Sequence, residues 1–255
     1  SAIRLSGVAT GFDPSGVTMA RVALPSLRYD SNSVVASSYQ QLIAALRAIP
    51  GVALAGAGTR VPMWGGSVDI GVRVAGRPGD PKVPQGFGHV RLVTTDYFET
   101  LGMPITQGRA FRESDMATGA PWVIVVNEDF AKKTFPDGNV IGQRISGWTR
   151  DSFPEWREII GVVGDIRSFG REAEIPPEIY MPITQAPASA WNAFQRRMTI
   201  VAKARGGTAI ATPMRAVVRQ FDRQLPVFDV QSMDDVLSQS SSSRRFNTLL
   251  LTLLG

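Results

Sequence analysis

Apolar residues near the start of the chain alternate between strand-like and helix-like spacing, which predicts a β-α-β unit. Residues 17–24 are mostly apolar and end at a proline, as a strand does. A helix is expected from Ser38, because Gln41 follows at the spacing of a capping box. Its apolar face carries Leu42, Ile43, Leu46 and Ile49. Pro50 and Gly51 then precede a second predicted strand at residues 52–61.

The same pattern returns twice more along the chain. Strands at residues 89–93 and 105–109 flank a short helix that we expect Thr94 or Thr95 to cap. Near the end, strands at residues 198–202 and 227–230 flank a helix that Thr208 is expected to cap. A last helix is predicted from Ser232, with Asp235 at the third helical position.

The middle of the chain differs in composition. Polar linkers at residues 112–121 and 187–194 enclose predicted strands at 122–126, 140–145, 158–163 and 178–181, and a helix capped by Asn127. We therefore predict an α+β fold in which a smaller mixed α/β lobe, residues 113–194, is inserted into a discontinuous lobe made of residues 1–112 and 195–237.

The C-terminal residues 238–255 combine a serine run with the leucine-rich segment 249–254. They are expected to form a stalk that leads into a truncated transmembrane helix. The alternative is that residues 238–243 are a flexible linker, because serine is a mediocre helix former.

Composition and charge exclude several kinds of site. The chain has no cysteine and only one histidine, His89, so a thiolate site or a multi-histidine metal site is impossible. The net charge is +5, but the arginines of residues 144–171 are interleaved with Asp151, Glu155, Glu158 and Asp165. Mixed signs indicate a solvated surface, not a nucleic-acid-binding stripe.

Motifs that resemble chemical sites each have a simpler structural explanation. Gly56-Ala57-Gly58 follows a strand but lacks the third glycine and the helix of a dinucleotide site. Asp165 ends an apolar strand, where a carboxylate usually accepts backbone N–H bonds. Asp234 and Asp235 lie in a helical first turn, where they favour the helix dipole.

We therefore expect no catalytic, cofactor-binding or metal-binding residue, and His89 is expected to be structural or solvent-exposed. Aromatic residues in the middle segment form either a core or an exposed interaction surface: Trp148, Phe153, Trp156, Phe169, Trp191 and Phe194.

An ordered set of short motifs resembles the periplasmic core domain of MacB-like, FtsX-like ABC transporter permeases, possibly of the duplicated orphan type. The motifs are GFDP at residues 11–14, residues 39–51, residues 93–109, VVNE at 125–128, FP at 135–136, IGQR at 141–144, IGVVGD at 160–165, EIYMP at 178–182 and RRFN at 244–247. The match covers nearly the whole chain in order.

The resemblance implies a porter-like lobe of β-α-β units with a smaller inserted lobe, and no catalysis in this domain. It also implies one transmembrane helix before Ser1 and three after Gly255, in a bacterial inner membrane with this domain on the periplasmic side. The partners implied are a second permease copy or internal duplicate, a cytoplasmic ATP-binding subunit and a periplasmic adaptor, but no nucleic acid. The domain would couple ATP hydrolysis to movement outside the membrane, in efflux or mechanotransmission.

Two other interpretations remain open at this stage. The domain could be a periplasmic module that captures a small amphiphile between two lobes, which requires an apolar cleft. It could also be a hydrolase that uses Asp165, although the residues offer no partner base or nucleophile near it in the sequence.

We predict that stability does not depend on a metal ion. Without cysteine and with one histidine, only carboxylates could act as ligands, and those suit calcium at most. The melting temperature should be unchanged by millimolar calcium. A rise that a chelator reverses would contradict this prediction.

Overall fold

The structure, a computed structural model, describes residues 11–62, 68–80, 82–147, 155–166, 175–187 and 192–238. The fold is α+β, as predicted from the sequence. All of its strands belong to one hydrogen-bonded sheet system, which has an open part and a closed part. Within the described ranges, no helix is long and apolar enough to cross a membrane.

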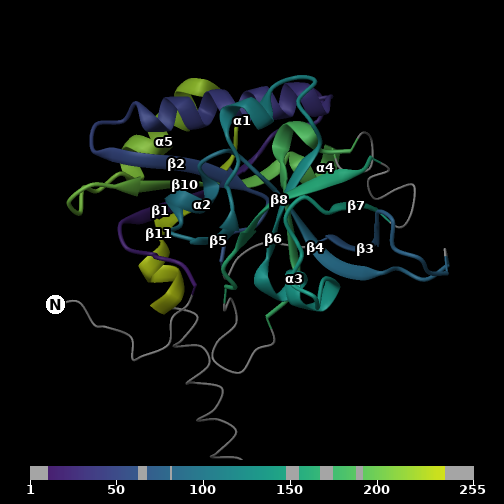
Figure 1. Cartoon of the computed structure of the whole chain (residues 1–255). Coiled ribbons are helices and arrows are strands. Elements are labelled where there is room, and N and C mark those ends of the chain that lie inside the picture. The colour runs from purple at the N-terminus through teal and green to yellow at the C-terminus, as the bar shows by residue number, and fades with distance from the viewer. Residues whose placement is uncertain are drawn as a thin grey trace, which may run out of the picture.

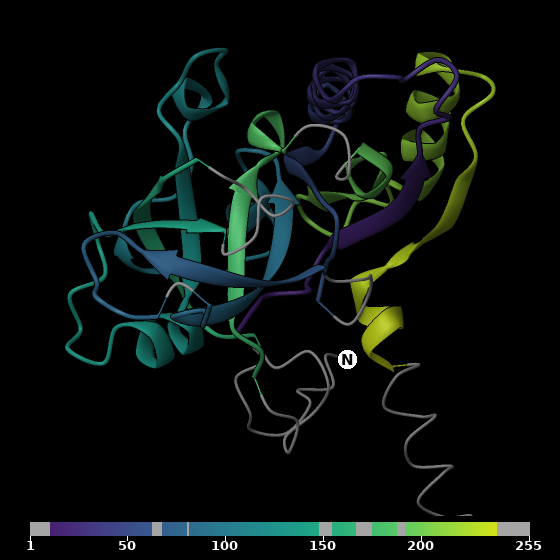
Figure 2. The same cartoon turned by 90° about the vertical axis from the view of Figure 1, so that its right-hand side faces the viewer.

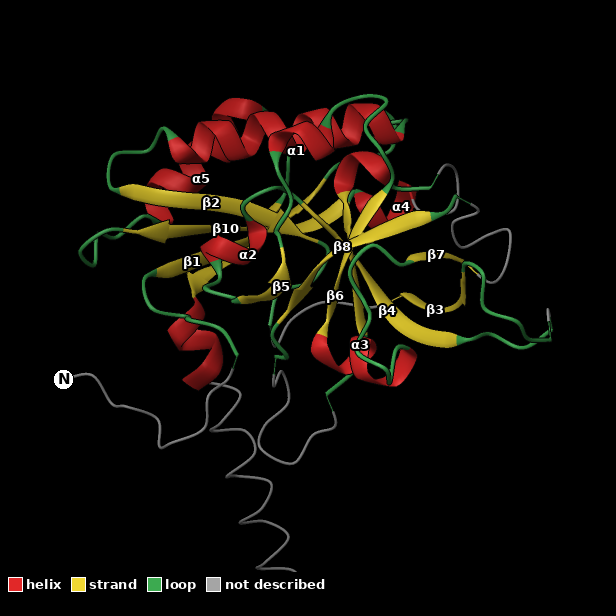
Figure 3. Cartoon of the chain, in the orientation of Figure 1, coloured by secondary structure: helices red, strands yellow, loops and turns green. Residues whose placement is uncertain are grey.

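The open part is an antiparallel sheet of four strands in the order β11-β1-β10-β2. These strands are β1 (Val17–Ala23), β2 (Val52–Gly58), β10 (Arg197–Ala204) and β11 (Val227–Ser232). Helices α1 (Asn32–Arg47) and α5 (Ala211–Phe221) cover one face (Figures 1 and 3). The chain order β-α-β-β-α-β with this strand order is the split β-α-β arrangement. We call this part the open-sheet half.

The closed part is a six-stranded barrel, which lies beside the open sheet (Figure 2). Pairing runs β4-β3-β7-β8-β6-β9 and returns from β9 to β4. Its strands are β3 (Val68–Val74), β4 (Gly86–Val93), β6 (Val123–Asn127), β7 (Arg144–Gly147), β8 (Arg157–Val163) and β9 (Glu178–Pro182). A short strand, β5 (Ile105–Gly108), pairs with β8. We call this part the barrel half.

Short helices connect and cover these strands. They are α2 (Tyr97–Thr100), α3 (Glu128–Thr134) and α4 (Asn192–Gln195), with single 3-10 turns η1 (Glu113–Met116) and η2 (Ile183–Gln185). Helix α2 packs on β2, whereas α3 lies at one end of the barrel (Figures 1 and 3).

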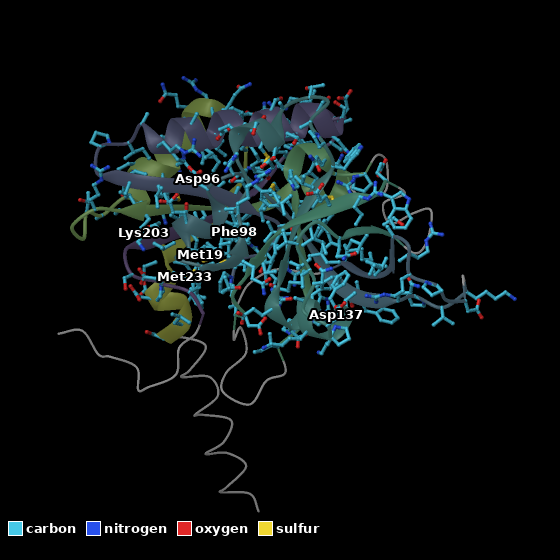
Figure 4. All side chains as sticks on the ribbon, in the orientation of Figure 1. Met19, Asp96, Phe98, Asp137, Lys203 and Met233 are labelled. Carbon is cyan, nitrogen blue, oxygen red and sulfur yellow. The ribbon has the colours of Figure 1, made fainter. Side chains whose placement is uncertain are left out.

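Two hydrophobic cores fill the molecule. The smaller one is the barrel interior, where inward side chains of the six strands meet Phe130 and Phe135 from the α3 segment. The larger core lies under α1 and α5 and continues across to the outer face of the barrel, where it includes Val93, Val125 and Tyr180. Met19, Phe98 and Met233 belong to this larger core (Figure 4). The two halves therefore share a core.

Helix α1 starts earlier than the sequence pattern predicted. It begins at Asn32 and not near Ser38, and the hydroxyl of Ser31 accepts the N–H of Val34 at 3.4 Å. Ser38 is a mid-helix residue whose hydroxyl donates to the carbonyl of Val34. The β-branched Val34 and Val35 had concealed this first turn, although Val35 is buried on the same face as the later apolar residues.

Neither of the two expected threonine caps is present: α2 follows Asp96, so neither Thr94 nor Thr95 caps it, and Thr208 does not cap α5. Asp96 precedes α2, while the Thr94 hydroxyl accepts the N–H of Ala57 at 2.8 Å. Thr208 donates to the carbonyl of Arg205, and α5 begins only after Ile210. The Asn127 cap is confirmed, since its side chain accepts the N–H of Phe130 at 3.0 Å.

The expected lobe boundary at residues 112 and 113 divides strands that pair with each other. Strands β3 and β4 lie before it, yet they bond to β7 and β9, which lie after it. Such pairing across about 80 residues leaves no local pattern in the sequence. The independence of residues 113–194 stays a prediction, and the pairing suggests residues 59–186 as the more complete unit.

We predict that a fragment of residues 59–186 unfolds cooperatively in urea, whereas a fragment of residues 113–194 does not. The shorter fragment lacks two of the six barrel strands, so its core opens to water and two strand edges lose their partners. Circular dichroism during urea titration measures the unfolding transition of each fragment. A cooperative transition for residues 113–194 would support the boundary expected from the sequence.

Candidate functional site

A buried ion pair lies where the two halves meet. Nη2 of Arg91, on β4, donates to Oε1 of Glu178, on β9, at 3.0 Å, and the Arg91 side chain is only 1% exposed. The two strands run parallel, with Arg91 opposite Tyr180. The Tyr180 hydroxyl donates a short hydrogen bond to Oε2 of Glu178. Both carboxylate oxygens therefore have donors, as burial of a charge requires.

Further hydrogen bonds fix Glu178 and the neighbouring Tyr97 in place. The N–H of Glu178 donates to the side-chain oxygen of Asn127 at 2.7 Å, so Asn127 both caps α3 and positions β9. On the opposite side, the Tyr97 hydroxyl donates to the carbonyl of Arg60 at 2.6 Å. We call the cluster of Arg60, Arg91, Tyr97, Glu178 and Tyr180 the polar joint.

Burial changes the proton affinity of several groups in the polar joint. Desolvation, together with the negative charge of Glu178, raises the pKa of Tyr97 and Tyr180 above the ordinary value. Desolvation and the nearby Arg91 guanidinium lower the pKa of Arg60. Both phenols therefore stay protonated near neutral pH and act as hydrogen-bond donors rather than as bases.

Aromatic contacts and two glycines hold α2 against the joint. The rings of Phe98 and Tyr180 meet edge to face, with centroids 4.9 Å apart. A methyl group on Gly58 would lie 2.5 Å from the Tyr97 ring, and one on Gly56 would lie 3.0 Å from the Tyr97 backbone. The Gly56-Ala57-Gly58 motif is therefore explained by close packing of α2 on β2.

The polar joint has no room for a substrate. The space between Arg60, Arg91, Glu178 and Tyr180 is a cavity of about 10 Å³, which at most admits a single water molecule. Its side chains also make most of their polar contacts to one another and to backbone. The ion pair of this arrangement holds β4 to β9, and Phe98 of α2 packs on Tyr180 from the side of β2.

The structure places the other candidate residues apart from one another. His89 lies on the outer surface of the barrel, where its ring contacts the carboxylate of Asp69 on the neighbouring strand. Asp165 accepts the N–H of Asp129 and the amide of Asn127, both at 2.9 Å. Burial raises the pKa of Asp165, and the nearby acidic Glu128 and Asp129 add to this effect.

Asp234 and Asp235 lie in the first turn of the helix at residues 233–238. Oγ of Ser232 accepts the N–H of Asp235 at 3.0 Å and donates to its carboxylate, as a capping residue does. Burial and the nearby carboxylates of Asp13 and Asp235 raise the pKa of Asp234. Across the described ranges, no group of three or more potential ligand side chains is placed to hold a metal ion.

A second buried cluster surrounds Gln185, and no pattern in the sequence indicated it. The Gln185 side chain accepts from the N–H of Val123 at 3.1 Å and from Arg157 at 3.2 Å, and it donates to two backbone carbonyls. Arg157 also lies 4.4 Å from the centroid of the Trp122 ring, and burial lowers its pKa to about 10. No local sequence signal links these residues, because η2 is far from β8 along the chain.

Of the six aromatic residues considered for an interaction surface, two lie in the described ranges. Trp156 is 41% exposed, and Phe194 packs partly buried against the barrel core. The other four lie outside the described residues: Trp148, Phe153, Phe169 and Trp191.

The family model of the MacB-like periplasmic core domain matches residues 8–220. The chain belongs to this family. It is thus the extracytoplasmic domain of an ABC transporter permease of the MacB and FtsX type, as the motif resemblance indicated. A search of curated proteins finds no match to the sequence.

Two solved structures resemble the fold at low sequence identity. The periplasmic region of MacB from Actinobacillus actinomycetemcomitans is 14% identical with a TM-score of 0.54, over 90% of this chain and 94% of that one. A domain of a putative permease protein from Porphyromonas gingivalis is 18% identical with a TM-score of 0.51, over 85% and 90%. These likenesses show that the family fold is kept while most side chains differ.

We predict that Glu178→Gln lowers the free energy of unfolding by about 3–5 kcal/mol, because it leaves the buried Arg91 guanidinium without a counter-charge. The double variant Arg91→Met/Glu178→Gln should lose less, since the Arg91 charge is removed together with its partner. Urea unfolding followed by tryptophan fluorescence measures both variants.

Asp69→Asn is the matched control, because it removes one carboxylate from an exposed pair with His89. It should change stability by about 0–1 kcal/mol. A Glu178→Gln effect as small as that of the control would show that the polar joint contributes little to the fold.

Proposed function

We propose that the domain couples ATP hydrolysis in the cytoplasm to movement outside the membrane, and that it performs no catalysis of its own. The observation that carries this proposal is the core that both halves share, together with the contact between Phe98 of α2, which packs on β2, and Tyr180 of β9. A domain that transmits force must move as one body, because a loose joint would absorb the movement of the membrane helices.

The positions of the chain ends support the same function. The first described residues and the helix at residues 233–238 lie at the same end of the molecule (Figures 1 and 2). Asp13 pairs with Lys203 of β10 at 2.7 Å, so the chain is fixed to the open sheet soon after it enters the domain. Two connections at one end suit a domain that is tilted by two membrane helices.

The proposed partners follow from this role. A cytoplasmic ATP-binding subunit would supply the energy, and a second copy of the permease domain would supply the surface against which this one moves. A periplasmic adaptor is a further proposed partner. The domain would lie on the periplasmic side of the bacterial inner membrane, with residues 238–255 as the stalk.

One observation favours the second candidate function, capture of a small amphiphile between the halves. A groove of about 600 Å³ separates the first half of α1 from the segment that follows η1. Val34 and Ala36 line one wall beside Ser33, Ser37 and Gln40, and Met116, Ala117 and Trp122 line the other beside Thr118 and Thr184. Its size falls in the range of ligand sites, whereas the polar joint leaves no comparable space.

We predict that two glycines inserted after Ser241 uncouple ATP hydrolysis from transport in the full transporter. Ser241 lies outside the described residues. The expected reason is that glycines interrupt a helix that would transmit movement. ATPase activity of the reconstituted transporter should persist, while movement of the transported compound should fall about tenfold or more.

The matched control inserts two glycines between Gly206 and Gly207. That turn between β10 and α5 has positive φ at both glycines and free space around them, so the insertion should leave coupling intact. Normal transport by the Ser241 insertion variant would refute coupling through the stalk and would favour the flexible-linker interpretation of residues 238–243.

A further inference from the structure

Helix α5 and the residues after it carry three arginines at intervals of four. Arg215, Arg219 and Arg223 line a groove of about 580 Å³ between α5 and β11, together with Gln220, Leu225 and Val227. Residues four apart lie on one face of a helix, so Arg215 and Arg219 project on the same side of α5. This part of the molecule is the flank farthest from the barrel (Figure 2). We call it the arginine groove.

The positive charge of the arginine groove is not balanced by described residues. None of the three guanidinium groups has a carboxylate of a described residue within 4.0 Å. Like charges four residues apart also destabilise a helix. An uncompensated row of this kind therefore favours binding of an anion from outside the chain.

The carboxylates near the arginine groove are already engaged elsewhere. Asp222, which lies between Arg219 and Arg223 in sequence, pairs with Arg28 at 2.8 Å and accepts the Tyr29 hydroxyl. Asp229 of β11 pairs with Arg21 at 2.9 Å. The chain thus directs its own acidic groups away from the groove and leaves the row of arginines available.

The groove is also partly organised in advance. Nη2 of Arg215 donates to the carbonyl of Val230 on β11 at 3.2 Å, which holds this side chain against the sheet edge. Leu225 is buried and gives the groove an apolar floor. A ligand here would meet guanidinium donors above an apolar surface, with the Gln220 carboxamide as an additional donor or acceptor.

We propose that the arginine groove binds a soluble ligand with two or more phosphate groups. Guanidinium groups bind phosphate oxygens through paired N–H donors, and several arginines together suit a ligand of several negative charges. The groove lies on α5, away from the end of the molecule where the helix at residues 233–238 lies (Figure 1). This position favours a free phosphorylated ligand over the headgroups of a bilayer.

The test is titration calorimetry of the whole chain with sodium tripolyphosphate at low salt. We expect Arg219→Ala/Arg223→Ala to weaken binding about tenfold or more, because each removed guanidinium is a lost charge-assisted donor pair. Arg219→Lys/Arg223→Lys should weaken it less, since charge is kept but paired donation is lost. Circular dichroism verifies that each variant is folded. We expect both to fold, because Arg219 and Arg223 are exposed.

The matched control is Arg144→Ala/Arg197→Ala, which removes the same charge from exposed positions on β7 and β10. It should leave affinity within about twofold, given the weak effect of distant surface charges. An equal loss in this control would overturn the proposal in favour of general attraction to a basic protein. Absence of binding at millimolar tripolyphosphate would also overturn it.

A second arm uses vesicles that contain phosphatidylglycerol. If only these vesicles bind, and Arg219→Ala/Arg223→Ala abolishes that binding, then the groove recognises lipid headgroups. The proposal of a soluble ligand would then be wrong. These measurements use the isolated domain, so their outcome is independent of transport and of the proposed coupling function.

Discussion

The whole fold depends on the pairing of β4, which has a partner on each side. It bonds to β3 on one edge and to β9 on the other, and its last residue, Val93, pairs with Gly58 of β2. Successive side chains of a strand point to opposite faces, so Val90 and Leu92 enter the barrel core while Val93 enters the larger core. One strand therefore contributes to both cores and fixes the position of each half.

Arg91 follows from the same alternation. It lies between Val90 and Leu92, so it must face away from the barrel interior and toward the open-sheet half. A shift of one residue in register would bring its charge into the barrel and move two apolar residues out. In that shifted register Arg91 would no longer share a face with Glu178 on β9, so the ion pair opposes a slip of one residue. An apolar pair would fill the space without this selectivity.

How much the sequence predicts depends on how far apart the interacting residues lie. The Asn127 cap and most strands were predicted, because their signals span a few residues. The first turn of α1 was missed since Val34 and Val35 are β-branched, and tertiary burial outweighs that propensity. Closure of the barrel joins β4 to β9 across the intervening chain, and no local pattern records such a pairing.

The candidate sites also divide into features with a local sequence signal and features made by residues far apart in the sequence. The absence of cysteine and the single histidine limit which metal and thiol sites the chain can form, and Asp165 accepts a backbone N–H as the sequence predicted. The polar joint could not be predicted, because Arg91 and Glu178 meet only when the barrel closes. The four-residue spacing of Arg215 and Arg219 is visible in the sequence, but their lack of acidic partners among the described residues is not.

The positions of the side chains show how the net charge of +5 is distributed over the molecule. Many basic groups lie in pairs, such as Arg28 with Asp222 and Arg47 with Asp96, and they add little to the local potential. Arg215, Arg219 and Arg223 have no such carboxylate partner among the described residues, and they line one groove, so their charges add up there. A local excess attracts anions more strongly than the same charge spread over the surface. The grouping of three arginines along one groove, with Asp222 and Asp229 paired to other residues, is thus what distinguishes the arginine groove from single exposed arginines.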